Sequence, residues 1–280
     1  MSAVVLASPD SAPIAARAPQ FAARALRASA AFWLTMIIAG QLMFAIYIVA
    51  FYGRAAALGR FDAWNKVLAV GYVPGDTGGN LALALHLAFA AVVTFGGTLQ
   101  LVPWLRGRWP RFHRWNGRVF VTSAVVGAIT GAIMIWTRNT TGDFLQHVAI
   151  TIDAALILGC AGCAWRDALA RRFDAHRRWA LRLFLCVSAG WFFRIGLMLW
   201  IVANGGPVGF DPKTFTGPFL TFLSFAQFLL PLAVLELYFH AQARREPGLA
   251  LATAALVAVL TLAMTGGIAA ATAIMWLPHL

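Results

Sequence analysis

Residues 79–102 read GNLALALHLAFAAVVTFGGTLQLV, a run that contains no Asp, Glu, Lys or Arg. A helix needs roughly 20 mostly apolar residues to cross the hydrocarbon core of a bilayer, and this run is long enough. Other stretches of the chain qualify in the same way, and only the connection over residues 52–78 is long. The predicted spans are Phe32–Phe51, Gly79–Val102, Gly117–Thr137, Asp143–Trp165, Trp179–Ala203, Gly217–Phe239 and Leu249–Trp276.

The composition of the whole chain agrees with this interpretation. Hydrophobic residues make up 61% of the 280 residues, charged residues make up 11%, and the mean hydropathy is +0.75. A soluble domain of this size would need much more polar surface. We therefore predict an all-α polytopic membrane protein with about seven transmembrane helices. Residues 1–30, rich in Ala, Pro and Ser, are expected to form a cytoplasmic tail without fixed structure. Residues 31–280 form the transmembrane domain, and its second to fifth helices, residues 79–203, form a four-helix core.

The basic residues are distributed unevenly between the two predicted sides of the membrane. The formal net charge is +12, and most arginines lie before the first span or in the loops after the second, fourth and sixth spans. Loops rich in Lys and Arg usually remain in the cytoplasm, so we predict a cytoplasmic N-terminus and an outer C-terminus. The same arginines meet anionic lipid headgroups. The bilayer is thus the expected partner, and nucleic acid is not.

Four of the histidines fall at two levels of the predicted bundle. His86 and His147 lie near the outer ends of the second and fourth spans, whereas His113 and His176 lie at the cytoplasmic starts of the third and fifth. Cofactor sites in helical bundles are commonly built from side chains on facing helices. Two imidazoles at one level suit the axial positions of haem b, and neither Cys nor carboxylate clusters accompany them. The pattern predicts iron ligation by a His86/His147 pair, a His113/His176 pair, or both.

Arginines next to these histidines are candidates for binding the haem propionates. Arg114 and Arg177 directly follow the two inner histidines. Arg194 lies deep in the fifth span, about five turns and about 27 Å along a straight helix from His176, at the predicted level of the outer pair. A buried guanidinium needs a partner. That partner is either an outer haem propionate or the carboxylate of Asp153, and the sequence leaves both open.

A set of residues between Leu85 and Leu199 resembles a known family pattern. On these residues the chain resembles the bacterial integral-membrane family called domain of unknown function 2306. The resemblance implies a bacterial inner-membrane location and carries no activity. The shared residues are His86, Gly96-Gly97, Gln100, Pro103, Leu105-Arg106, Arg111, His113-Arg114, Gly117-Arg118, His176-Arg177-Arg178-Trp179, Arg182 and Arg194.

The placement of the histidines is also similar to that in dihaem cytochromes of the b-561 class. Those proteins hold one bis-His haem between the second and fourth helices of a core and another between the third and fifth. They move electrons across a membrane from ascorbate or a similar donor. This chain departs from that arrangement because His113 and His176 lie at helix starts among arginines.

Three classes of function follow from these observations. The first is a membrane-embedded b-type cytochrome-like electron-transfer protein, with one or two haems and a quinone or small molecule as electron donor. The second is a transporter of small molecules or protons, in which His86, His147, Asp153, Arg194 and Glu236 form a polar path. The third is a non-catalytic membrane scaffold with interfacial histidines. The sequence does not decide whether the protein is an enzyme.

Overall fold

The computed structural model describes residues 14–68, 70–137 and 142–280, and within them the chain is helical. The only extended pairing in these residues is an isolated bridge between Asp211 and Thr216. The prediction of an all-α protein is confirmed. The α-helices are α1 (Ile14–Tyr47), α2 (Arg54–Ala57), α3 (Thr77–Leu101), α4 (Pro103–Arg108), α5 (Pro110–Thr137), α6 (Phe144–Leu169), α7 (Phe173–Val187), α8 (Ala189–Asn204), α9 (Pro218–Arg244) and α10 (Pro247–Ala271).

By length and composition, the described residues contain six helices able to cross a membrane, and seven spans if α7 and α8 count as one. The polytopic architecture is therefore as predicted. The first helix starts earlier than expected, at Ile14, inside the stretch predicted to lack structure. Its early turns are held because Ala22 and Leu26 are buried against Ala241 and Ala250. Residues 1–13 of the predicted tail lie outside the described residues.

The fifth predicted span is broken rather than continuous. Helices α7 and α8 meet at Ser188 with a bend of 51°. Kinks commonly form where Gly and Ser lie close together, and Gly190 follows Ser188 by two residues. A neighbouring helix stabilises the bend, because Gln41 of α1 donates a hydrogen bond of 3.0 Å to the buried Ser188 hydroxyl. A straight helix from Trp179 to Ala203 was the wrong prediction.

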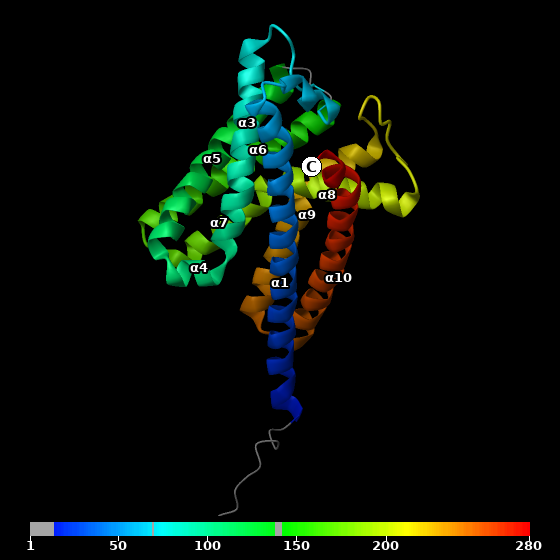
Figure 1. Cartoon of the computed structure of the whole chain (residues 1–280). Helices are drawn as coiled ribbons and strands as arrows, with labels where there is room; N and C mark the ends of the chain where they lie inside the picture. Colours follow the sequence, from blue (N-terminus) through cyan, green and yellow to red (C-terminus); the bar gives the residue numbers. More distant parts are fainter. Residues whose placement is uncertain (1–13, 69, 138–141) are drawn as a thin grey trace, which may run out of the picture.

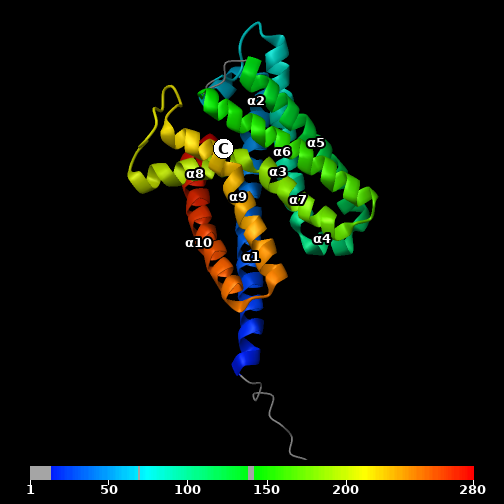
Figure 2. The same cartoon turned by 180° about the vertical axis from the view of Figure 1, so that it is seen from behind.

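The helices form two groups that diverge toward the arginine-rich end of the protein. In Figures 1 and 2, α4 and the adjacent ends of α3, α5, α6 and α7 lean away from α1, α9 and α10. Within the first group α3 packs on α5, α5 on α6 and α6 on α7, so the two expected hairpins are present. In the second group α10 packs against α1 and α8. The divergence leaves space between the groups.

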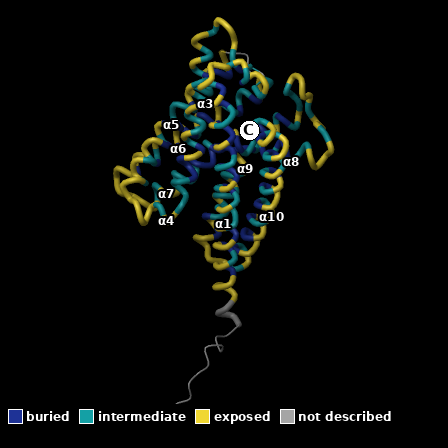
Figure 3. Tube along the Cα trace, viewed as in Figure 1, coloured by how far each residue is buried: buried dark blue, intermediate teal, exposed yellow. Residues whose placement is uncertain are grey.

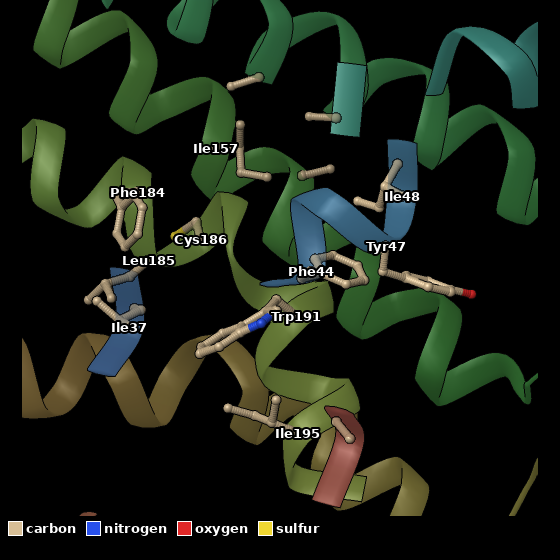
Figure 4. Close-up of a cluster of buried hydrophobic side chains, with 14 of the residues drawn as sticks. Ile37, Phe44, Tyr47, Ile48, Ile157, Phe184, Leu185, Cys186, Trp191 and Ile195 are labelled. Atoms are coloured by element: carbon tan, nitrogen blue, oxygen red, sulfur yellow. The ribbon is translucent and has the colours of Figure 1, made fainter. Parts of the chain in front are cut away.

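The buried core lies where the two groups meet. Trp191 and Ile195 of α8 pack there with Phe184 of α7 and Ile37 of α1, as Figure 4 shows. Buried positions gather at this crossing, whereas the tips of the diverging helices are exposed (Figure 3). Glycine allows the close approach, because a Cβ on Gly267 of α10 would lie 2.6 Å from the Ile195 carbonyl oxygen. Small residues at such contacts are typical of membrane helices.

The Gly267 contact predicts a stability difference between two glycine substitutions. Gly267→Ala forces α10 away from the α8 backbone and should lower stability by about 1–3 kcal/mol. Gly159→Ala is the control, because nothing lies within 4 Å of a Cβ at that helical position. Alanine favours helix over glycine there, so stability should hold or rise slightly. Thermal unfolding in mild detergent, followed by size-exclusion chromatography, measures both. Equal melting temperatures would contradict the packing account.

Candidate functional site

A cleft of about 1100 Å³ lies between the two groups of helices. Most of its wall is apolar, with Leu223 and Leu230 from α9, Leu199 from α8 and Met264 from α10. Polar residues are contributed mainly by the first helix group. They are Gln100, Arg106, His113, Arg114, Arg118, Asp174, His176 and Arg177, with Gln227 from α9. The cleft is thus an apolar space with a strongly cationic end, suited to an amphiphilic molecule that carries negative charge.

The structure brings His113 and His176 to this one cleft. His113 lies in the first turn of α5 and His176 in the first turn of α7, and their rings are close enough to interact electrostatically. The Nδ1 atom of His176 lies 2.8 Å from the Ala164 carbonyl oxygen of α6. The Nδ1 atom of His113 is buried without a hydrogen-bond partner among the described residues. The imidazole of His176 is thus positioned by α6, whereas the ring of His113 makes no such contact in the described residues.

Contacts between α3 and α5 hold the segment that carries His113, and they involve Gly96, Gly97 and Gln100 of the family pattern. Gln100 near the end of α3 donates a hydrogen bond of 2.9 Å to the His113 carbonyl oxygen, and Asn116 donates one of 2.8 Å to the Gly96 carbonyl oxygen. A Cβ on Gly96 would lie 3.1 Å from the Asn116 amide oxygen, and one on Gly97 would lie 2.9 Å from the Phe120 ring. The shared residues are visible in the sequence, but the contacts that they make between α3 and α5 become apparent only in the structure.

The two arginines expected beside the inner histidines also line the cleft. Arg114 and Arg177 are exposed and face no carboxylate within ion-pair distance in the described part of the chain. Arg177 lies near Tyr238 of α9, close enough for an electrostatic interaction across the mouth of the cleft. Asp174 is the one acidic residue among the described lining residues. The cationic end is therefore poorly neutralised by the protein itself.

The outer histidines both pack against α5. A Cβ on Gly131 of α5 would lie 3.3 Å from Cε1 of His86, while the ring of His147 packs edge-on to Trp136 of α5 at 5.6 Å. Positions 131 and 136 are about 140° apart around a helix, so the two rings meet different faces of α5. His147 Nε2 is buried without a partner in the described residues; His86 Nδ1 is also buried without one, but the His86 ring lies close enough to the Gly127 backbone of α5 to interact with it. No direct ring contact joins the pair there.

Arg194 does not lie where a straight fifth span would place it. It also forms no ion pair with Asp153 in the described residues. The bend at Ser188 redirects α8, so helical spacing counted from His176 does not give its direction. Arg194 donates 2.6 Å to the Gly190 carbonyl oxygen, lies 5.4 Å from the centroid of the Phe44 ring, and is near enough to His86 to interact electrostatically. In the described residues the Asp153 ion pair is absent; Asp153 instead lies beside Cys186 at the α6–α7 interface.

An ion pair that the sequence did not predict joins the two helix groups on either side of the cleft. Arg182 of α7 binds Glu236 of α9 with two hydrogen bonds of 2.7 and 2.9 Å, and its guanidinium lies 4.6 Å from the centroid of the Trp179 ring. Glu236 is thus part of a contact between the helix groups rather than an isolated polar group. The pair holds α7, which carries His176, against α9.

These features define a multi-pass membrane protein with an amphipathic cleft between two helix groups. The family described as "Predicted membrane protein (DUF2306)" matches residues 83–230, a range that contains His86, His113, His147 and His176. The chain belongs to this family. Neither the curated proteins nor the solved structures gave a match. The family assignment supports the membrane architecture and does not add support for a likeness to b-561-type cytochromes.

The Arg182–Glu236 pair predicts a modest stability effect. Glu236→Gln should lower stability by about 1 kcal/mol, because one of the two charge-assisted hydrogen bonds is lost and the other weakens, while half of the Glu236 side chain, 51%, is already exposed. Glu246→Gln is the control, since Glu246 forms no ion pair in the described residues. Melting temperatures in detergent measure both variants. A Glu236→Gln protein as stable as the control would show that the pair does not hold the cleft together.

Proposed function

We propose that the protein is a membrane-embedded b-type haem protein that transfers electrons. The single observation that carries this proposal is the meeting of His113 and His176 in one cleft with apolar walls and a cationic end. Haem b combines a flat apolar ring, an iron atom that accepts two imidazoles, and two carboxylates. Each of these parts has a counterpart in the chemistry of the cleft.

The residues of the cleft fit this group in three respects. The contact between His176 Nδ1 and the Ala164 carbonyl fixes that ring and leaves Nε2 as the available ligand atom, an arrangement common for metal-bound histidines. His113 lines the same cleft as His176 and is the second available imidazole. Arg114 and Arg177 are the proposed partners of the carboxylates, because bidentate arginine–carboxylate pairs are strong.

A second haem at the other level is the less supported part of the proposal. It would use His86 and His147, each with a buried nitrogen that lacks a partner in the described residues, and Arg194, which lies close to His86. The two rings meet different faces of α5 and are not in contact. The inner pair is therefore the primary site, and the outer pair is an extension to be tested separately.

A bis-His haem supplies one-electron oxidation and reduction without an open position for substrate. In that scheme the chain orients the two imidazoles, neutralises the carboxylates and surrounds the ring with apolar side chains, which together set the potential. The proposed electron donor is a quinone or another small molecule that reaches the protein from the membrane or the outer face. The proposed location is a bacterial inner membrane with the arginine-rich end in the cytoplasm.

A transporter is the second candidate, because two observations favour it. The Oδ1 atom of Asp153 is buried without a hydrogen-bond partner in the described residues, and intramembrane carboxyls mark proton paths by default. In addition, α7 and α8 form one broken span, a feature of many transporters. Proton or solute flux into proteoliposomes that depends on Asp153 would favour this candidate over the cytochrome.

The cytochrome proposal predicts a specific absorption spectrum. Protein purified in mild detergent from haem-replete cells should show a b-type alpha band in the dithionite-reduced minus oxidised spectrum. His113→Ala and His176→Ala should each weaken and shift the inner contribution to that band, because the loss of one imidazole ends the bis-imidazole ligation of the iron. The pyridine haemochrome assay then gives the number of haems per chain.

The matched control is His240→Ala, since His240 is exposed near the end of α9 and does not line the cleft. Its spectrum should equal that of the unsubstituted protein. A further decrease with His86→Ala or His147→Ala would establish the outer haem. A colourless, folded preparation would contradict the cytochrome proposal outright.

A further inference from the structure

A second crevice, of about 660 Å³, lies at the arginine-rich end between α1 and the turn that joins α9 to α10. Its floor is apolar and belongs to the buried cluster formed by Ala22, Leu26, Ala241 and Ala250. Its rim is polar and comes from both sides of the crevice. The rim residues are Gln20, Arg24 and Arg27 of α1, Gln242 of α9, and Arg245 at the α9 C-terminus.

The rim carries three positive charges, and none of the described residues that line the crevice is acidic. Arg27 uses its Nε atom to bond the Ala23 carbonyl oxygen, which leaves its terminal nitrogens available as donors. Arg24 and Arg245 have no ion-pair partner in the part of the chain that the structure describes. Several arginines that line one crevice without a carboxylate provide the chemistry that recognises a phosphate group.

We propose that this crevice binds the phosphate headgroup of an anionic phospholipid from the surrounding bilayer. A lipid fits better than a free phosphate because the crevice lies at the ends of three membrane-spanning helices and has an apolar floor. Phe21, which is 64% exposed, lies on α1 beside the rim and presents apolar surface to an acyl chain. Basic pockets between transmembrane helices bind anionic lipid headgroups in this way. The site is separate from the cleft of His113 and His176 and does not depend on the proposed haem.

The test compares two variants that lose the same number of charges at the same end of the protein. The crevice variant combines Arg24→Ala, Arg27→Ala and Arg245→Ala. The control variant combines Arg108→Ala, Arg111→Ala and Arg171→Ala, which are exposed and line neither the crevice nor the cleft. Native mass spectrometry from detergent measures the binding of phosphatidylglycerol, phosphatidylcholine and sn-glycerol 3-phosphate to each protein.

The unsubstituted protein and the control variant should bind phosphatidylglycerol roughly tenfold or more tightly than phosphatidylcholine, and the crevice variant should lose this preference. If the control variant lost the preference for phosphatidylglycerol to the same extent, the proposal would be overturned, because the lipid would then respond to the overall charge of the protein and not to the crevice. Binding of glycerol phosphate as tight as that of the lipid would overturn the lipid as its occupant. Absence of any preference in the unsubstituted protein would also overturn it.

Arg245→Gly separates lipid binding from folding. Arg245 caps α9 in the left-handed backbone region, with φ of 56°, where glycine is preferred over residues that carry a Cβ. This substitution should therefore keep or raise the melting temperature while it weakens phosphatidylglycerol binding severalfold. A protein that is more stable and binds the lipid undiminished would exclude Arg245 from the site and contradict the proposed rim.

Discussion

The hydrocarbon core of a bilayer offers no hydrogen-bond partners, so each polar group placed there must find its partner within the protein. This constraint accounts for the helical backbone of the chain and for many of its side-chain contacts between helices. Gln41 bonds Ser188 where the fifth predicted span breaks, and Asn116 bonds the Gly96 backbone between α3 and α5. Arg182 and Glu236 join the two helix groups. Polar contacts thus hold the bend and the helix pairs that shape the cleft.

Some buried polar atoms have no hydrogen-bond partner in the described residues, and these atoms are candidates for binding a ligand. Among the described residues, seven buried side-chain nitrogen or oxygen atoms lack a hydrogen-bond partner, and three of them belong to His86, His113 and His147. Leaving such a group unpaired costs about 1–3 kcal/mol. A ligand that used these imidazoles would offset that cost. The proposal of a haem rests on the shared cleft of His113 and His176, and the unpaired nitrogens of His86 and His147 are the reason to test the outer pair as well.

The sequence predicted the helices well because a bilayer imposes a minimum apolar length on every span. It also predicted that His113 and His176 would share a level, since both begin helices at the arginine-rich end. It failed at Ser188, because hydropathy does not distinguish a straight span from two helices joined at a bend. The predicted direction of the Arg194 side chain was wrong for the same reason, because it assumed a straight fifth span.

Other features depend on contacts between distant parts of the chain. The cleft arises from the divergence of two helix groups, which no local pattern encodes. The Arg182–Glu236 pair joins residues 54 positions apart, so the sequence gives Glu236 no partner and suggests a polar path only under the transporter alternative. His86 and His147 contact different faces of α5, and this arrangement likewise follows from the packing of the helices and not from the spacing of the histidines in the sequence.

Electron paramagnetic resonance of the oxidised protein tests the central claim most directly, because it reports the ligands of the iron rather than its presence alone. A haem held by His113 and His176 should give a low-spin ferric signal of the bis-imidazole type. His176→Ala should convert that signal to a high-spin signal or abolish it, whereas His240→Ala should leave it unchanged. A preparation whose only ferric signal is high-spin, or whose low-spin signal is undiminished in both His113→Ala and His176→Ala proteins, would contradict the account.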